Sequence, residues 1–243
     1  MDFREYQEQS VRQDVYVNEE GLNRYIAKVF GWTFVGLLVT ALTVAFFIIG
    51  AAVSPAIANF VIAAMDIMLF IWIGQMVLIF ALCRKIERLN PVTAVLMYLF
   101  YAASMGVLFT WVTLTTEIGD LFLAFGLTAV SFGTMAVYGL VTKKDLTKMG
   151  NMLFFALIGL VIAIVVNLFL GSAPLTFVIS IAGLFIFLGL TIYDTNRIKS
   201  FYYYSQEQSD NPALASNLAV YSALGLYLNF INIFLFILRL IRD

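Results

Sequence analysis

Four long stretches of this chain contain no charged residue. They hold 37, 28, 45 and 28 residues, at positions 29–65, 89–116, 149–193 and 211–238. A helix needs about 20 apolar residues to cross a bilayer. Charged residues make up only 12% of the chain, about half the share of an average soluble domain, and hydrophobic residues make up 62%. We therefore expect an integral membrane protein.

Seven apolar spans account for these stretches and for the segment between Asp120 and Lys143. The two longest stretches have room for a turn, near residues 52–55 and 171–174. The apolar runs are continuous and do not alternate, which favours helices over a β-barrel. All four prolines fall where a span would begin, and helices tolerate proline in their first turn. The sequence predicts an all-α membrane protein with seven transmembrane helices at 29–50, 56–82, 91–114, 120–141, 150–170, 174–195 and 213–238.

Basic residues lie almost entirely on one side of these spans. Of the 14 Lys and Arg residues, 12 precede the first span or lie in the loops after spans two, four and six. The positive-inside rule then places the N-terminus in the cytoplasm, with residues 1–21 as a flexible cytoplasmic tail before a seven-helix domain at 22–243. Seven spans place the C-terminus outside, where Arg239 and Arg242 disagree mildly with the rule. A last helix that only partly spans would remove this disagreement.

Several kinds of chemistry are missing from the sequence. Histidine is absent, which excludes histidine metal sites, Ser-His hydrolysis and histidine proton relays. Cys83 is the only cysteine, so neither an internal disulfide nor a thiolate metal site is expected. No phosphate-binding glycine motif follows a strand, and nothing indicates nucleic-acid binding. We expect no enzyme, no cofactor and no tightly bound metal.

The few polar groups inside the spans carry the functional information, because a charge in hydrocarbon costs about 2.5–3.5 kcal/mol or more. Asp194 ends the 45-residue stretch, and it is either a functional carboxylate or an interfacial one paired with Arg197 or Lys199. Asp66 lies within the second predicted span. It is either an outer-side cation site or a headgroup-level residue of a span that begins later.

The seventh span carries two amides, Asn229 and Asn232, which are three residues apart and share a helix face. Such a face favours another helix or a wet cavity over lipid. Packing between helices by hydrogen bonds is the alternative to a functional site.

These segments resemble the transmembrane Bax inhibitor motif family. The resemblance covers the chain from about residue 22 and is most specific in YDTNRI at 193–198 and LYLNFINIF at 226–234. The basic cluster after span two and KKDL at 143–146 also match it, and YVNEEGL at 16–22 is similar to bacterial members. The resemblance implies three helix hairpins around a central C-terminal helix, in a bacterial cytoplasmic (inner) membrane. It also implies a passive, pH-sensitive leak of cations, chiefly calcium.

Members of this family sense pH with two aspartates, one in span six and one in span seven, and an arginine at the inner end of span two can pair with the first. The resemblance carries these roles to Asp194 and Arg84. The second aspartate falls on Asn229, where this sequence departs from the family. An amide does not titrate, so we expect weaker pH gating, or gating displaced to more acidic pH.

Two functions remain open at this stage. One is a pH-modulated calcium leak channel with Asp194 near a cytoplasmic gate. The other is a non-transporting protein that binds other membrane proteins and regulates stress or quality control. The expected partners are therefore the lipid bilayer, calcium or other cations, and possible membrane-protein clients. An intramembrane aspartyl protease is disfavoured, because Asn229 stands where a second carboxylate is needed.

Overall fold

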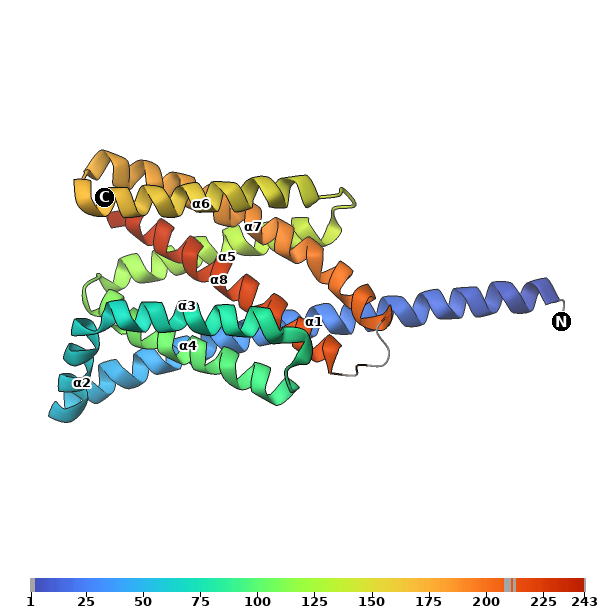
Figure 1. Cartoon of the computed structure of the whole chain (residues 1–243), viewed down its shortest axis with the longest axis horizontal. Coiled ribbons are helices and arrows are strands. Elements are labelled where there is room, and N and C mark those ends of the chain that lie inside the picture. The colour runs from blue at the N-terminus through green and yellow to red at the C-terminus, as the bar shows by residue number, and fades with distance from the viewer. Residues whose placement is uncertain (1–2, 208–210, 212, 243) are drawn as a thin grey trace.

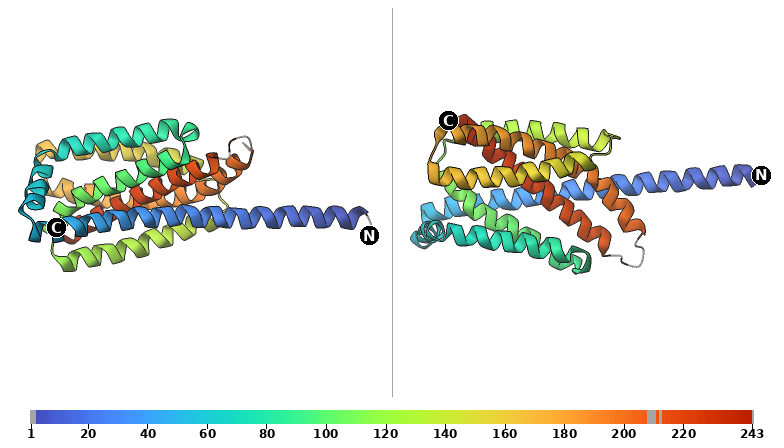
Figure 2. Two further views of the ribbon diagram at one scale, coloured as in Figure 1. Left: turned by 90° about the horizontal axis from the view of Figure 1, so that it is seen from below. Right: turned by 45° about the horizontal axis from the view of Figure 1, so that its top comes forward.

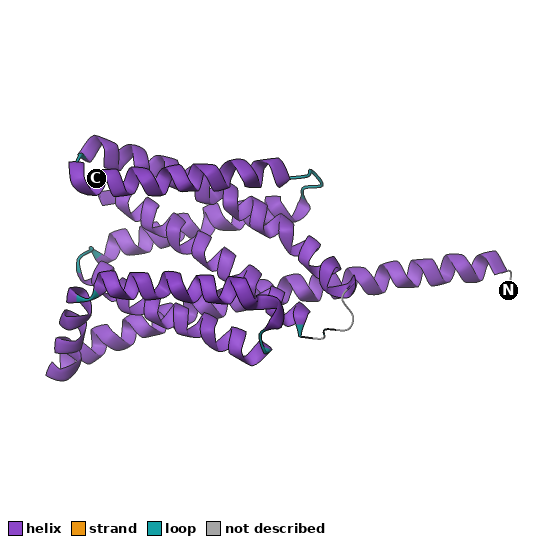
Figure 3. Cartoon of the chain, viewed as in Figure 1, coloured by secondary structure: helices purple, strands orange, loops and turns teal. Residues whose placement is uncertain are grey.

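The chain folds as a bundle of helices. The computed structural model describes residues 3–207, 211 and 213–242, without the side chains of residues 3–18 and 65, and the described residues contain no strand (Figures 1 and 3). Seven helices are long and apolar enough to cross a membrane, which confirms the predicted all-helical integral membrane protein. The elements are α1 (Phe3–Val53), α2 (Pro55–Asp66), α3 (Met68–Lys85), the 3-10 helix η1 (Ile86–Arg88), α4 (Pro91–Leu114), α5 (Ile118–Val141), α6 (Thr147–Leu170), α7 (Ala173–Glu207) and α8 (Leu214–Arg242).

Helix α8 occupies the centre of the bundle. In its most apolar stretch 61% of the residues are buried inside the protein, against 11–33% in the other six spanning helices. It packs against α1, α4, α5 and α7. With 29 residues it is about 43 Å long, and Arg242 at its end donates a hydrogen bond to Thr116 between α4 and α5. The last helix therefore runs the full height of the bundle, and its central position agrees with the prediction.

The other spanning helices pack in two groups of three around α8. In one group α1 and α3 pack against α4, and in the other α5 and α6 pack against α7 (Figures 1 and 2). The predicted hairpins describe the order of the connections along the chain, whereas the outer helices pack against one another mainly within each group of three. We call the end of the bundle that holds the α3–α4, α5–α6 and α7–α8 connections the basic end, because it carries the basic loops.

The second predicted span, 56–82, is wrong at its start. The chain bends at Ile67, so that α2 runs across the end of the bundle and α3 alone spans it (Figure 1). A straight helix from Pro55 to Lys85 would be about 46 Å long, well beyond the roughly 30 Å hydrocarbon core. The bend also places exposed Asp66 at a helix end instead of inside a span.

The sixth predicted span, 174–195, is wrong at its end, because α7 continues to Glu207. Contacts with neighbouring helices explain the extension. The Lys199 ammonium donates to the carbonyl of Leu140 at the end of α5, and the Asn196 amide donates to the carbonyls of Gly139 and Thr142, each at 3.3 Å. These side chains satisfy carbonyls that the last turn of α5 leaves without partners.

Local signals in the sequence set other helix ends as predicted. The Asn90 side chain accepts a hydrogen bond from the backbone N–H of Val92 at 2.9 Å, and Pro91 opens α4. At the predicted turn 171–174, Gly171 ends α6 with a positive φ of 59°. Pro212 lies outside the described residues.

The N-terminal part of α1 projects beyond the basic end of the bundle (Figures 1 and 2). The backbone is helical from Phe3 onward and continues into the first span. Residues 3–21 of the predicted tail (1–21) therefore form the start of α1, and residues 1 and 2 lie outside the described residues. Its flexibility and its cytoplasmic location stay predictions.

Close contacts between helices depend on individual glycines. At Gly139 of α5, an added Cβ would lie 2.5 Å from the backbone carbonyl oxygen of Ile192 in α7. At Gly126, on the same helix, an added Cβ would meet no described atom within 4 Å. Alanine substitution at these two positions therefore distinguishes the effect of a packing clash on stability from the effect of helix propensity.

We expect Gly139→Ala to lower the thermal unfolding temperature in detergent, because the added methyl forces α5 and α7 apart at a cost of about 1–3 kcal/mol. Gly126→Ala is the matched control, and it should leave the unfolding temperature unchanged or raise it slightly. Equal destabilisation by both substitutions would contradict the packing role of Gly139.

Candidate functional site

The central feature of the site is a hydrogen bond between α7 and α8. The Nδ2 of Asn229 lies 2.7 Å from Oδ2 of Asp194 and donates to it. Asn229 is 4% exposed, and Asp194 is half-buried on the neighbouring helix. The structure thus brings into contact two predicted site residues that lie 35 positions apart in the chain.

Among the described residues, Asn229 is the side chain that donates a hydrogen bond to Asp194. The neighbouring hydroxyls have other acceptors. The hydroxyls of Thr191 and Thr195 each donate to a carbonyl of their own helix, at 2.8 and 2.6 Å. Gly225, one turn before Asn229, also faces the carboxylate, since a Cβ there would lie 3.6 Å from Oδ2 of Asp194. The carboxylate therefore faces α8 at the amide of Asn229 and, one turn earlier, at the bare backbone of Gly225.

Aromatic and cationic groups lie between Asp194 and the basic end. The guanidinium carbon of Arg197 lies 4.5 Å from the centre of the Phe201 ring, and that ring meets Tyr221 of α8 at 5.7 Å between centroids. Tyr221 lies within electrostatic range of Asp194, Arg197 and Cys83. These side chains separate the carboxylate from the connection between α7 and α8.

The structure does not form the ion pairs considered for Asp194. Within the described part of the chain, the one ion pair shorter than 4.0 Å joins Arg24 to Glu20. Lys199 donates to the end of α5 instead. Arg84 is exposed at the end of α3 and is not brought into contact with Asp194.

The two secondary polar residues also lie apart from this pair. Asn232 donates to the carbonyl of Leu228, one turn earlier on its own helix, at 2.8 Å. Asp66 is exposed at the α2–α3 bend, at the opposite end from the basic loops.

Sequence reasoning missed two contributors. Asn217 is fully buried and donates to the carbonyls of Ile86 at 2.9 Å and Leu89 at 2.7 Å, so it fixes η1 against α8. Gly225 provides the space beside Asp194. Gly225 precedes Asn229 by four residues, a spacing that places both on one face of α8 and was visible in the sequence.

Comparison with known proteins identifies the family. The model of the family described as "Inhibitor of apoptosis-promoting Bax1" matches residues 22–243. The chain belongs to this Bax1 inhibitor family. It is 38% identical to the inner membrane protein YbhL of Escherichia coli K12 over 223 residues, covering 90% of this chain and 92% of YbhL. It is also 30% identical to the uncharacterized membrane protein SpyM3_0260 of Streptococcus pyogenes, covering 92% and 94% of the two chains.

These matches confirm the family resemblance and the integral membrane class. The family match includes all seven spanning helices and both residues of the Asp194–Asn229 pair. YbhL is by its name an inner membrane protein, which agrees with the membrane predicted for this Bax1 inhibitor family member.

A double-mutant cycle with Asp194→Ala and Asn229→Ala should give a coupling energy of about 1.5–3 kcal/mol in equilibrium unfolding in detergent, because the bond involves a group that can be charged. The same cycle with Asn232→Ala is the control, and its coupling with Asp194→Ala should be close to zero. A coupling for Asn229 no larger than that for Asn232 would show that the bond contributes nothing to the fold.

Proposed function

We propose that this protein is a passive cation leak channel, calcium-permeable and modulated by pH, with the Asp194–Asn229 pair at its gate. The observation that carries the proposal is the hydrogen bond between these side chains, because it places a titratable group against the central helix of a membrane bundle. Ionisable residues inside membrane spans commonly mark ion pathways. A carboxylate attracts cations, and its contact with α8 ties its protonation to helix packing.

The proposal includes an orientation. By the positive-inside rule the basic end faces the cytoplasm, so the pair lies toward the cytoplasmic side. Asp194 lies 21 residues, about 32 Å along the helix, from the start of α7 at the other end. A cation entering from outside would therefore cross most of the bundle before it reached the carboxylate.

The proposed pH response arises from one carboxylate. The groups that face Asp194 are Asn229 and Tyr221 on α8 and Arg197 on its own helix. The amide of Asn229 does not titrate, and tyrosine ordinarily titrates near pH 10. Protonation of Asp194 would turn an acceptor of the Asn229 hydrogen bond into a neutral acid and weaken the contact between α7 and α8.

Replacing Asn229 by Asp should move the midpoint of calcium flux against pH toward neutral pH by about one unit or more. Two carboxylates at this separation repel, and the pair retains a proton to higher pH. The measurement is calcium flux by purified protein in liposomes between pH 5 and 8. Identical pH profiles for wild type and Asn229→Asp would contradict the proposed gate.

Asp145→Asn is the matched control, because it also changes one carboxylate at the basic end. Asp145 lies in the α5–α6 loop and accepts hydrogen bonds from the Thr147 hydroxyl at 2.6 Å and the Thr147 N–H at 2.9 Å. These bonds hold the pKa of Asp145 below its usual value, so it stays ionised from pH 5 to 8. Its substitution should leave the flux profile unchanged.

Asp194→Asn should remove the pH dependence of the flux while the protein remains folded, because it replaces the titratable group by an amide of the same shape. Potassium and sodium flux measured in parallel would define the selectivity. Absence of flux from the wild-type protein at every pH would instead favour the alternative, a non-transporting protein that regulates other membrane proteins.

A further inference from the structure

One face of the central helix α8 is only half-buried along much of its length. Between Leu218 and Leu238, the residues on its other faces are buried. The half-buried ones recur at intervals of four and three residues, which places them in one stripe along α8. The stripe consists of Tyr221, Gly225, Leu228, Asn232 and Leu235.

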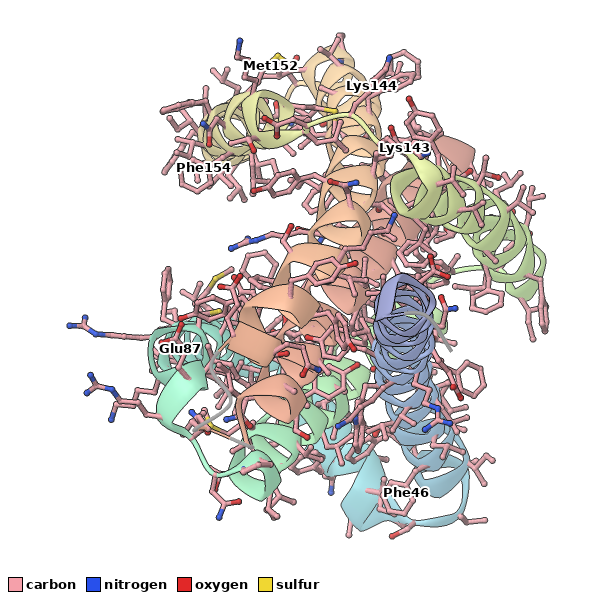
Figure 4. All side chains as sticks on the ribbon, turned by 90° about the vertical axis from the view of Figure 1, so that its right-hand side faces the viewer. Phe46, Glu87, Lys143, Lys144, Met152 and Phe154 are labelled. Carbon is pink, nitrogen blue, oxygen red and sulfur yellow. The ribbon has the colours of Figure 1, made fainter. Side chains whose placement is uncertain are left out.

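The stripe lies between the two groups of three helices. Helix α3 packs against α4 and helix α6 packs against α7, but α3 and α6 do not pack against each other along their length. Viewed from the basic end, Glu87 in η1, which follows α3, and Phe154 on α6 lie on opposite sides of this opening (Figure 4). We use the name α3–α6 groove for this stripe of α8, which α3 and α6 leave half-buried. Half-buried Asp194 and Arg197 of α7 lie beside its floor.

Positive charge gathers where the groove reaches the basic end. The segment from Cys83 to Leu89 lines a hollow of about 730 Å³. It carries three exposed cations, Arg84, Lys85 and Arg88, and one carboxylate, Glu87, which gives it a net charge of +2. Arg197 on the neighbouring helix adds a further cation.

Contacts with α7 and α8 hold this segment in place without using its cations. Asn217 donates to the carbonyls of Ile86 and Leu89, and the hydroxyl of Tyr204 lies 3.4 Å from the Glu87 carboxylate. Tyr203 and Tyr204, 45% and 38% exposed, lie at the same end of the bundle. Exposed tyrosines are typical of the headgroup level of a membrane.

We propose that this region binds an anionic phospholipid, with its phosphate at Arg84, Lys85 and Arg88 and one acyl chain in the α3–α6 groove. The charge of the segment selects the anionic headgroup, since basic pockets at the cytoplasmic ends of membrane helices bind such headgroups. The Leu228 and Leu235 side chains offer the chain an apolar floor, and Gly225 leaves it space. The occupant is a single lipid, bound from the side of the bundle.

The lipid also bears on the proposed gate, and this consequence rests on the proposed leak function. Arg84 bound to a phosphate is held at the surface, away from Asp194. If pairing of Arg84 with Asp194 closes the leak, an anionic lipid that binds Arg84 would compete with the carboxylate for the arginine and favour the open state. Calcium flux should then be higher in liposomes of phosphatidylglycerol and phosphatidylcholine than in pure phosphatidylcholine.

The direct test measures lipid retention rather than flux, so it can fail or succeed independently of the leak. Native mass spectrometry of the detergent-solubilised full chain, titrated with phosphatidylglycerol or phosphatidylcholine, should show a preference for phosphatidylglycerol. Arg84→Gln with Arg88→Gln should weaken phosphatidylglycerol binding by about tenfold to thirtyfold. The matched control is Lys143→Gln with Lys144→Gln, which removes two charges from the loop between α5 and α6 at the same end (Figure 4). The control should change binding by less than about twofold.

A second pair of variants tests the groove. Leu228→Trp fills its floor and should weaken binding of long-chain phosphatidylglycerol, whereas Leu96→Trp, at a 61% exposed position on α4, should not. Soluble glycerol phosphate should bind far more weakly than the intact lipid. Equal losses from both charge pairs, no preference for the anionic lipid, or glycerol phosphate binding as tightly as the lipid would each overturn the proposal. The charge variants alter exposed side chains, so the test remains decisive if Leu228→Trp does not fold.

Discussion

Helix α8 has neighbours on nearly every side, so its buried polar side chains can find partners only inside the protein, and the Ser222 hydroxyl finds none among the described residues. Each of three buried ones meets a different neighbour. Asn217 donates to the carbonyls around η1, Tyr227 shares a 2.7 Å hydrogen bond with Thr40 of α1, and Asn229 donates to Asp194 of α7. An unpaired polar group costs several kcal/mol where no water reaches it. These contacts therefore fix the rotation of α8 as well as its position, and the half-buried stripe is the face that remains.

The three contacts differ in how they respond to conditions. The contacts of Asn217 and Tyr227 involve neutral groups, so they hold over the whole physiological pH range. The contact of Asn229 with Asp194 depends on whether the carboxylate carries a proton. This hydrogen bond links α8 to the α5–α6–α7 group, whereas the Tyr227 hydrogen bond links it to the α1–α3–α4 group. A change in protonation would thus act on one side of the bundle and leave the other anchored.

The sequence predicted most strongly those features that depend on the solvent. The cost of a charge in hydrocarbon makes the seven spans visible from the four uncharged stretches, their turns and the segment between Asp120 and Lys143. Asn90 with Pro91 marks the start of α4. Features that depend on packing were not predictable. The end of α7 is set by contacts of Lys199 and Asn196 with α5, and the bend at Ile67 follows no local breaker residue. At the site, the resemblance brought Asp194 and Asn229 together correctly. It did not predict that Arg84 would be exposed at the surface. That exposure depends on how the side chains around the end of α3 pack.

The amide at position 229 changes what the pair can do, even though the helices keep their contact. Two carboxylates that share a proton titrate as a coupled pair, whereas a carboxylate beside an amide exchanges one proton at a single site. Any response to pH through Asp194 is therefore graded, spread over about two pH units and without cooperativity. Gly225 places no side chain beside the carboxylate, and the open stripe on α8 continues past it to Tyr221 toward the basic end. A lipid phosphate bound at Arg84 would hold that arginine away from the carboxylate. The lipid composition of the membrane and the pH would then act on the same carboxylate, one through Arg84 and the other through the proton it carries.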